Sequence, residues 1–412
     1  MSPTLKKALL LLLILVVAGA IGFALYYFFI KAGPAALRLP TVKKTPVTGE
    51  LPPAGERKPG EGAGVVTPGA GQLPTAGVIT GTQPGASYYR PEAVTKIISD
   101  YAVYPSLSYS GAMRYHNAAD GKFYRLGPDG QASAISDQVF YNVSNVTWAK
   151  NQDKAVIEYP DNSKIVYNFE TNKQVTLPKH WSEFSFSNDS SQIVAKSLGL
   201  SPENRWLVVT NDDGTGAKLI EPMGENADKV QISWSPSRQV VAFSQTGQPL
   251  GADRREVLLV GLNHENFKSL TVEGMGFLPE WSPTGKKLLY SVYSGRSNLK
   301  PELWITNSYG DEIGSNRQLL NINTWADKCA FGGDEVIFCA VPRDLPQGAG
   351  LSRNISVGTP DDLYKIDLKT GLKTPIGLGG ENFSINNISY DAEKNKVIFT
   401  DVNKNGIFEA NL

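Results

Sequence analysis

Two stretches of the chain decide the fold: residues 231–244 read QISWSPSRQVVAFS, and residues 279–292 read PEWSPTGKKLLYSV. Each contains a short run that ends in tryptophan, a Ser-Pro turn and a second apolar run. Short runs rich in branched and aromatic residues, separated by turn residues, are typical of β-hairpins. Each stretch therefore predicts one antiparallel hairpin.

The same pattern occurs seven times between residues 92 and 412. The other five copies lie at residues 105–116, 145–159, 183–197, 323–341 and 387–402. The aromatic residues of the seven first runs are Tyr109, Trp148, Phe186, Trp234, Trp281, Trp325 and Tyr390. A third β-prone run follows most copies and a fourth follows several. A unit of four short strands repeated about every 46 residues is the signature of a propeller blade.

The first run of each unit also fits the centre of a propeller. Large apolar residues stand two positions before most of the aromatics, and small residues lie between and after them. This period-2 alternation places large and small side chains on opposite faces of the strand, which suits the crowded hub. We predict an all-β, seven-bladed β-propeller, with six or eight blades as alternatives. Residues 93–99 are expected to supply the missing outer strand of the last blade and so close the ring.

The turns resemble a known family. Trp234-Ser235-Pro236 and Trp281-Ser282-Pro283 are similar to the W-S-P-D-G turn of TolB-like propellers, and the other five units are degenerate versions. The resemblance implies a domain at residues 92–412 that binds proteins in the periplasm or at the cell surface. Bacterial members of this family are often tethered to the membrane.

An uncharged apolar run begins at Ala8 and ends at Ile30, and its 23 residues are enough for a transmembrane helix. A cleaved signal peptide is the alternative, since the Ala-Gly-Ala at 18–20 resembles a cleavage site. The run continues ten residues further, which favours an uncleaved signal anchor. We expect residues 1–7 in the cytoplasm and a single-pass helix at 8–30. The C-terminal domain is then extracytoplasmic, outside the plasma membrane.

A Gly/Pro-rich segment follows at residues 31–91, and its composition predicts a flexible linker. Charge is also distributed unevenly: residues 1–91 hold nine Lys or Arg and three Asp or Glu, although the whole chain has 40 of each sign. The domain at 92–412 is therefore acidic, with a net charge of −6. An acidic domain argues against nucleic acid as a partner.

Long loops mark one face of the predicted propeller. The connections between second and third strands are long at 245–254, 294–301 and 342–360, and long loops are usually functional or disordered. We predict that this face binds a protein or cell-envelope partner. Its predicted ligand-binding residues are Asn145, Glu183, Gln231, Glu280, Arg343, Asp344, Arg353 and Asn387. The alternative is that these side chains are solvated strand ends.

The C-terminal sequence DVNKNG at 401–406 resembles the start of a calcium-binding loop. Asp401, Asn403, Asn405 and Glu409 are the predicted ligands of a possible Ca²⁺, because oxygen ligands suit this hard cation. Position 12 of an EF-hand would be Leu412, so the loop is not an EF-hand. The alternative is an Asn-Gly hairpin turn that binds no metal.

The chain has two cysteines, Cys329 and Cys339, on either side of a turn. If the turn is centred on Asp334, the two face each other on adjacent strands and form a disulfide outside the cytoplasm. A register shifted by one residue would instead leave two buried thiols on opposite faces.

Two functional hypotheses remain. No G-x-S-x-G, H-E-x-x-H or P-loop motif occurs in the chain. We therefore favour a non-catalytic scaffold that binds a protein or envelope polymer. The alternative is a propeller enzyme (a lactonase, lyase or glycan hydrolase) that uses carboxylates such as Glu183 and Glu280 at the channel mouth.

Overall fold

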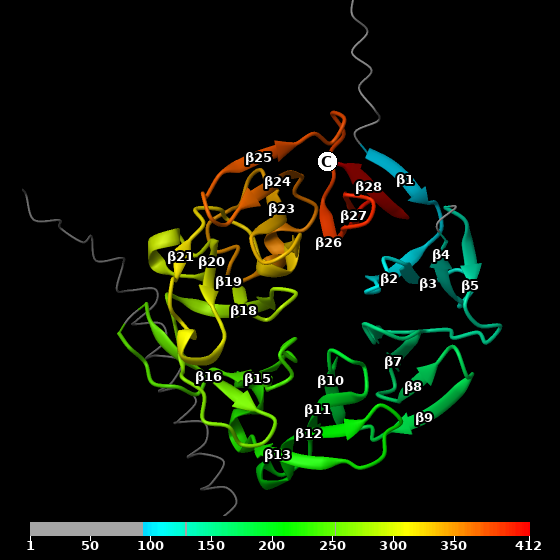
Figure 1. The fold of residues 1–412 in the computed structure, drawn as a ribbon, viewed down its shortest axis with the longest axis horizontal. Coiled ribbons are helices and arrows are strands. Elements are labelled where there is room, and N and C mark those ends of the chain that lie inside the picture. The colour runs from blue at the N-terminus through cyan, green and yellow to red at the C-terminus, as the bar shows by residue number, and fades with distance from the viewer. Residues whose placement is uncertain (1–93, 128–129, 252) are drawn as a thin grey trace, which may run out of the picture. The chain divides into compact units, whose positions relative to one another are not determined.

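The computed structural model describes residues 94–127, 130–251 and 253–412. Their strands form seven four-stranded antiparallel sheets, which stand around a ring as blades (Figure 1). The prediction of an all-β, seven-bladed β-propeller is therefore confirmed. The predicted transmembrane segment 8–30 and linker 31–91 lie outside the described residues. Within the described residues, no helix has the length and apolar character needed to cross a bilayer.

Each blade runs from an inner strand at the channel to an outer strand at the rim. Blade 1 holds β2 (Ala102–Leu107), β3 (Met113–Asn117), β4 (Phe123–Leu126) and β5 (Ala132–Ala134); blade 2 holds β6 (Asn145–Trp148), β7 (Lys154–Glu158), β8 (Lys164–Asn168) and β9 (Lys173–Leu177). Blade 3 holds β10 (Trp181–Phe186), β11 (Gln192–Leu198), β12 (Arg205–Asn211) and β13 (Lys218–Pro222); blade 4 holds β14 (Val230–Ile232), β15 (Val240–Ser244), β16 (Arg255–Gly261) and β17 (Leu270–Val272).

The remaining blades follow the same order. Blade 5 holds β18 (Met275–Trp281), β19 (Lys287–Tyr293), β20 (Pro301–Asn307) and β21 (Gln318–Leu319); blade 6 holds β22 (Cys329–Phe331), β23 (Val336–Pro342), β24 (Asp361–Asp367) and β25 (Lys373–Ile376). Blade 7 holds β26 (Ile385–Asp391), β27 (Lys396–Asp401), β28 (Ile407–Asn411) and β1 (Val94–Ile98). Short 3-10 helices lie in the connections: η2 (Pro202–Asn204), η3 (Gly224–Lys229), η4 (Gly295–Ser297), η5 (Gly310–Glu312), η6 (Ala326–Lys328) and η7 (Arg353–Ser356).

Blade 7 is built from both ends of the domain. The first strand, β1, pairs antiparallel with the last strand, β28, with Val94 opposite Ala410. Ile98 is buried in a core cluster that also contains Met113 and Ile407. The prediction that residues 93–99 close the ring is confirmed, and the strand occupies Val94–Ile98.

The aromatic residues of the inner strands pack between blades. Trp281 of blade 5 stacks on Phe243 of blade 4 with ring centroids 5.2 Å apart. Tyr390 of blade 7 stacks on Phe338 of blade 6 at 4.6 Å. In these blades the aromatic ring is buried against the preceding repeat, so a single repeat does not have a complete core.

Two of the predicted repeat aromatics occupy other positions. Trp325 lies before η6 and outside β22, and Phe331 ends the inner strand of blade 6 opposite Ile337. Tyr109 follows the end of β2, whose last residue is Leu107. The fold keeps an apolar residue at the end of the inner strand but does not require it to be tryptophan or tyrosine.

The serine of the Trp-Ser-Pro turn has a structural role. Ser187, Ser235 and Ser282 are fully buried. Their Oγ atoms accept hydrogen bonds from the backbone N–H of Gln192 at 3.0 Å, Val240 at 3.1 Å and Lys287 at 3.1 Å, respectively. The hydroxyl therefore satisfies a buried backbone donor at the start of the second strand, which tightens the turn.

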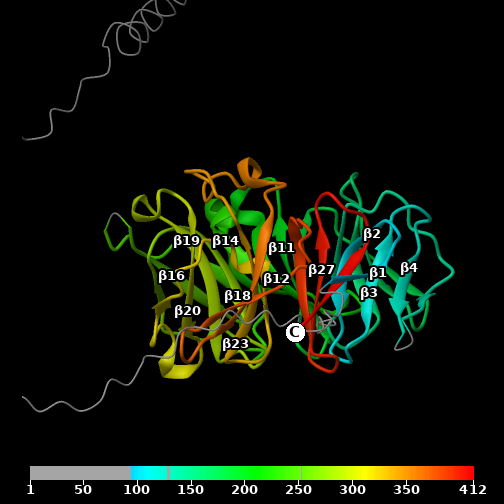
Figure 2. The same cartoon turned by 90° about the horizontal axis from the view of Figure 1, so that it is seen from above.

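The connections lie at two faces of the ring, because each blade is antiparallel and all seven inner strands run the same way. We call the face with the second-to-third-strand loops and the connections between blades the loop face. The face with the first-to-second and third-to-fourth turns is the turn face. Figure 2 shows the ring from its side, with the orange 343–360 loop at its upper edge. The long loops 245–254, 294–300 and 343–360 all belong to the loop face.

Candidate functional site

Three predicted ligand-binding residues lie at the loop-face ends of inner strands. Asn145 begins β6 and its Nδ2 donates a hydrogen bond to Glu158 at 2.7 Å. Glu183 lies where the pairing of β10 with β11 is irregular, and its backbone φ is positive, at 51°. Its carboxylate forms an ion pair with the Lys196 ammonium at 2.7 Å. The buried Oε1 of Gln231 in β14 has no hydrogen-bond partner. Asn145 and Glu183 thus have partners within their own blades.

Arg343, Asp344 and Asn387 lie on blades 6 and 7. The Arg343 guanidinium donates to Asp362 at 2.7 Å and to Asn382 at 2.6 Å, so it joins the 343–360 loop to the connection between these blades. Asp344 and Asn387 are exposed. The predicted residues are distributed over six blades, and the structure does not bring them into one cluster.

Arg353 holds the 343–360 loop against the entry to blade 6. Its guanidinium forms an ion pair with Asp327 at 2.5 Å and lies over the Trp325 ring, 4.8 Å from the centroid. Trp325 also packs against Leu345 and Ala349 of the same loop. Cation–π and apolar contacts of this kind fix the loop backbone in place.

The loop also contacts its neighbour in blade 5. The backbone N–H of Gly348 donates to the Asn298 carbonyl at 3.1 Å, and that of Gly350 donates to the Leu299 carbonyl at 2.7 Å. Asn298 and Leu299 both have positive φ. Loops 294–300 and 343–360 therefore form one continuous surface across blades 5 and 6.

Exposed apolar side chains gather on the loop face. Among the described residues, 17 large hydrophobic side chains are exposed. Eleven belong to loop-face connections or to strand ends on that face: Tyr101, Val139, Tyr141, Leu198, Leu200, Leu250, Met275, Leu351, Ile355, Val357 and Val402. By the same criterion the turn face holds Tyr109, Tyr309, Leu372 and Leu412. Leu351, Ile355 and Val357 share one loop, and local groups of exposed apolar residues of this kind mark interaction surfaces.

Sequence reasoning named polar residues on this face and missed these aliphatic ones. The signal was present as Leu351, Ile355 and Val357, three apolar residues within a long loop that contributes no strand. Their side chains are 58%, 51% and 61% exposed. The sequence alone does not show whether such a side chain is exposed, because its exposure depends on whether the loop lies at the surface.

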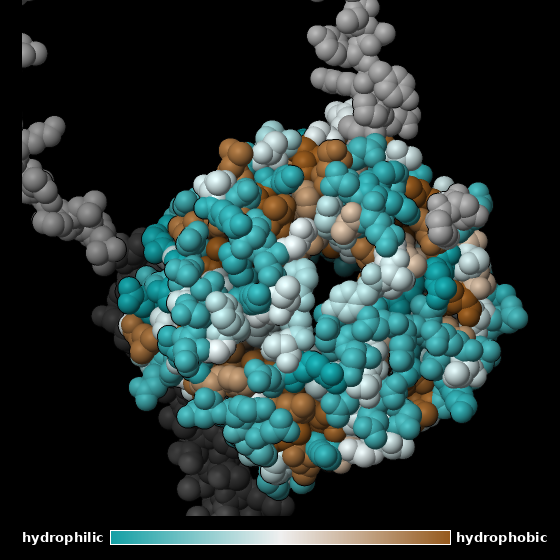
Figure 3. Space-filling model, viewed as in Figure 1, coloured by the Kyte–Doolittle hydropathy of each residue, from teal (hydrophilic) through white to brown (hydrophobic). Residues whose placement is uncertain are grey.

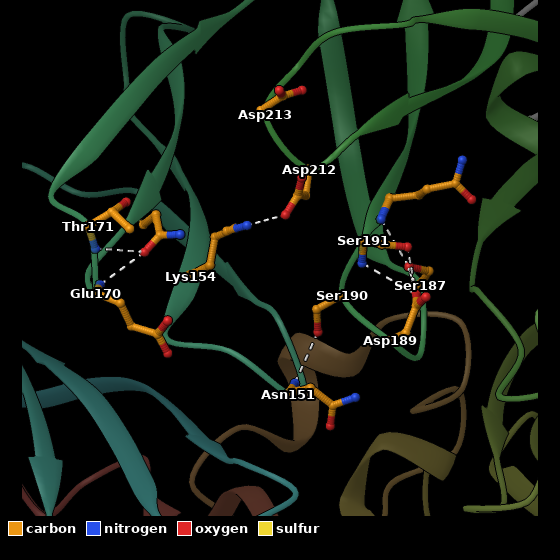
Figure 4. A network of polar contacts seen from close by, with 12 residues as sticks. Asn151, Lys154, Glu170, Thr171, Ser187, Asp189, Ser190, Ser191, Asp212 and Asp213 are labelled. Carbon is orange, nitrogen blue, oxygen red and sulfur yellow. Dashed lines mark hydrogen bonds and ion pairs between the residues drawn. The ribbon is translucent and has the colours of Figure 1, made fainter.

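The turn face has a different character, because its side chains satisfy one another. In Figure 4, Lys154 of β7 reaches Asp212, which follows β12, and the Asn151 backbone N–H donates to Ser190 Oγ at 3.0 Å. Asp189 accepts hydrogen bonds from Ser187 and Ser191 within its own turn. These contacts join blades 2 and 3 at the turn face.

A cavity of about 530 Å³ occupies the channel at the centre of the ring. The inner strands β2, β6, β18, β22 and β26 and the turns at Pro236 and Pro283 line it. Figure 3 shows the corresponding opening, bordered mainly by hydrophilic and intermediate surface.

Glu280 lies in this channel cavity and not at the loop-face end of its strand, which corrects its predicted place. It immediately precedes Trp281, the last residue of β18, and pairs with Leu289. Lys150, in the turn after β6, lines the same cavity. Sequence reasoning did not single out Lys150, although its position just after the aromatic Trp148 places it at the channel mouth.

The channel shifts the pKa values of both charged residues. The side chains of Glu280 and Lys150 are exposed to solvent. Their hydration is reduced by the channel walls around them and not by a packed core. This desolvation raises the pKa of Glu280 to about 7; the Lys150 ammonium opposes the shift and Asp327 adds to it. Desolvation likewise lowers the pKa of Lys150, against the attraction of Glu280.

The predicted calcium ligands do not converge. Asp401 accepts backbone hydrogen bonds from Asn403 at 2.7 Å and from Ser384 at 2.5 Å. Glu409 pairs with Lys396 at the other end of β27, away from the 402–406 loop that also contains Asn405. Among the described residues, no group of three or more His, Cys, Asp or Glu side chains is arranged to hold a metal ion.

Cys329 and Cys339 are directly opposite each other on β22 and β23, with Cα atoms 4.1 Å apart, and are joined by a disulfide. The two strands therefore have the register for which a disulfide was predicted, with Asp334 inside the turn. Both residues belong to the core cluster between blades 5 and 6.

Comparison with known proteins gives the fold alone. No family model matches the chain, and no curated protein sequence matches it. The β-propeller domain of Cps50 (Swd1) from Myceliophteria thermophila is 12% identical, with a TM-score of 0.51 over 77% of this chain and 99% of that one. The chain is a β-propeller.

Two oligogalacturonate lyases are similar to the same extent. One, in complex with manganese, is 13% identical with a TM-score of 0.51, and one from Vibrio parahaemolyticus is 11% identical with a TM-score of 0.50. Each match covers 77% of this chain and 93% of the lyase chain. The Cps50 domain and the lyases share this architecture, so the site residues must carry any functional argument.

Proposed function

We propose that this propeller is a non-catalytic binding module that recognises a protein through its loop face. The observation that carries the proposal is the gathering of 11 of the 17 exposed large hydrophobic side chains on that face. Leu351, Ile355 and Val357 stand on a loop that Arg353 and Trp325 hold in place. A preorganised apolar surface loses little entropy on binding.

The chemistry of the surface favours a protein over an envelope polymer. Leucine, isoleucine and valine offer no hydrogen bonds to sugar hydroxyls, whereas they complement the apolar core of a protein interface. The TolB-like resemblance of the Trp234 and Trp281 turns supports the same partner class. We place the domain outside the plasma membrane, tethered through residues 8–30, as the N-terminal sequence predicts.

The enzyme alternative receives less support from the site. Among the residues that line the channel cavity, Glu280 is the one acidic side chain, and Glu183 is paired with Lys196 elsewhere. Glycan hydrolysis typically uses two carboxyl groups that flank the scissile bond. A pKa near 7 would suit Glu280 for proton transfer, but Asp327, the carboxylate that acts on this pKa, is paired with Arg353 and does not line the cavity.

The test is cross-linking with mass spectrometry on the full chain in its native cells. The triple variant Leu351→Asp, Ile355→Asp and Val357→Asp is compared with a turn-face control, Tyr309→Asp and Leu372→Asp, whose side chains are 48% and 64% exposed. We expect a reproducible set of cross-linked proteins to disappear in the first variant and to remain in the control. If both variants retain that set, or both lose it, the loop face is not the binding surface.

A further inference from the structure

The channel cavity carries two opposite charges that do not pair with each other. Lys150 belongs to blade 2 and Glu280 to blade 5, which are not neighbours in the ring. Their pKa shifts show that each senses the other electrostatically. Among the described residues, neither charged group makes an ion pair within 4.0 Å. The cavity thus presents an ammonium and a carboxylate, held apart, to whatever enters it.

Trp281, the residue after Glu280, packs its ring between blades 4 and 5 and leaves a buried donor unpaired. Trp281, adjacent to Glu280, lines the cavity, and its buried indole Nε1 makes no hydrogen bond. The corresponding indoles of other blades are satisfied: Trp148 donates to the Tyr104 carbonyl at 2.9 Å and Trp234 to the Arg238 carbonyl at 3.3 Å. Buried polar groups are normally paired, so Trp281 is an exception among these three tryptophans.

The rest of the wall is suited to a small organic molecule. Pro236, Pro283, Phe331 and Tyr390 add apolar and aromatic surface around the two charges. A volume of about 530 Å³ lies within the usual range of small-molecule sites. Such sites combine apolar walls with a few polar groups that fix the orientation of the ligand.

We propose that the channel cavity binds a compact zwitterion with separated charges, such as a short peptide or an ω-amino acid. The ligand carboxylate contacts the Lys150 ammonium, and its ammonium contacts Glu280. Both contacts are charge-assisted hydrogen bonds, which are the stronger kind. Because the protein charges lie more than 4.0 Å apart, a ligand whose own charges are separated by several bonds spans them better than glycine does. This site is independent of the loop-face proposal.

Calorimetric titration of the full chain tests the proposal. The ligands are glycine, diglycine, triglycine, β-alanine, γ-aminobutyrate and 6-aminohexanoate, with N-acetylated and methyl-ester forms as blocked controls. We expect the affinity to depend on chain length and to fall at least about tenfold when either end is blocked, which corresponds to about 1.4 kcal/mol. No measurable binding of any member at neutral pH overturns the proposal.

Charge-reversal variants separate a zwitterion site from a simple ion site. Lys150→Glu and Glu280→Lys are each expected to abolish binding, and the double variant is expected to restore it with the ligand reversed. Lys286→Met, an exposed lysine in the blade 5 turn, is the matched control and leaves affinity unchanged. If Glu280→Gln retains full affinity, the cavity binds carboxylates alone and the zwitterion proposal is wrong.

Discussion

Lys328 and Asp361 form an ion pair inside the protein, with the ammonium 2.7 Å from one carboxylate oxygen and 2.8 Å from the other. Asp361 also accepts the backbone N–H of Ile385, the first residue of blade 7, at 2.7 Å. Burial lowers the pKa of Lys328 and raises that of Asp361, and their mutual attraction opposes both shifts. The pair therefore connects blades 6 and 7 through a buried charge.

We expect Asp361→Asn to lower the free energy of unfolding by about 3–5 kcal/mol, because it leaves the Lys328 ammonium buried without a counter-charge. The double variant Lys328→Met, Asp361→Asn removes both charges and should lose less. Urea denaturation measures both. The exposed pair Lys179 and Asp161 is the matched control, and its removal should change stability far less, because solvent screens exposed ion pairs. Equal losses at the two pairs would contradict this account.

The closing strand should be as important to stability as an internal strand. Ile98 is 5% exposed and packs in the cluster with Ile407, so Ile98→Ala should cost about 2–5 kcal/mol. Thr95→Ala, on the same strand but only half-buried, is the control and should cost much less. Urea denaturation followed by tryptophan fluorescence measures both variants. A small loss at Ile98 would show that β1 contributes little to the closed ring.

Glu280 should titrate near neutral pH. We expect NMR of the labelled carboxyl carbon to give a pKa of about 7. Lys150→Met should raise this pKa further, because it removes the positive charge that opposes the shift, and Asp327→Asn should lower it. Since the ionised carboxylate binds the ligand ammonium, zwitterion affinity should fall as the pH falls through about 7. Affinity that stays constant from pH 8 to pH 6 would separate Glu280 from the binding step.

Reduction of the disulfide should destabilise blade 6. Cys329 and Cys339 are separated by 10 residues, and a loop of that length corresponds to about 2–3 kcal/mol on the chain-entropy estimate. Mass analysis with and without reductant detects the bond, and urea denaturation of the Cys329→Ala, Cys339→Ala variant measures its contribution. Two free thiols in the unreduced protein, isolated from its native cells, would contradict the pairing.

Calcium or a chelator should leave the melting temperature unchanged. Asp401 is engaged with two backbone N–H groups, and Glu409 is held by Lys396. Asp401→Ala should nevertheless lower stability by about 1 kcal/mol, with or without calcium, because those hydrogen bonds are lost. A calcium-dependent rise in melting temperature that disappears in an Asn403→Ala, Asn405→Ala variant would establish the metal site instead.

The repeat pattern predicted the architecture because its physical cause is local. Trp234, Trp281 and their Ser-Pro turns specify the hub strand and the tight turn within about ten residues, and the disulfide register followed from the turn at Asp334. The seven blades and the position of the closing strand came from the same reasoning.

The site was harder to predict because the strand register is not regular at the loop-face ends of several inner strands. The pairing of the inner strands is irregular at this end in blades 1, 3, 5 and 7, for example between Ser182 and Phe184 and between Met275 and Leu278. Each irregularity changes which side chain faces the channel, so counting back from the aromatic gives no equivalent positions. Glu280 was assigned to the wrong level for another reason: it stands one residue before its aromatic, Trp281, whereas the other predicted inner-strand residues stand three residues before theirs. Lys150 of blade 2 and Glu280 of blade 5 line one cavity, and the repeat pattern does not show this proximity.

The closure of blade 7 also fixes an order of events on the ribosome. Blades 1 to 6 each use a contiguous stretch of chain and are able to form as it emerges, whereas Lys96 must wait for Phe408, its partner near the very end. Until β28 has been made, β1 and β27 both present unpaired edges that invite aggregation or proteolysis. A chain that terminates before Ile407 cannot remove these edges, so ring closure acts as a check that the whole domain has been made.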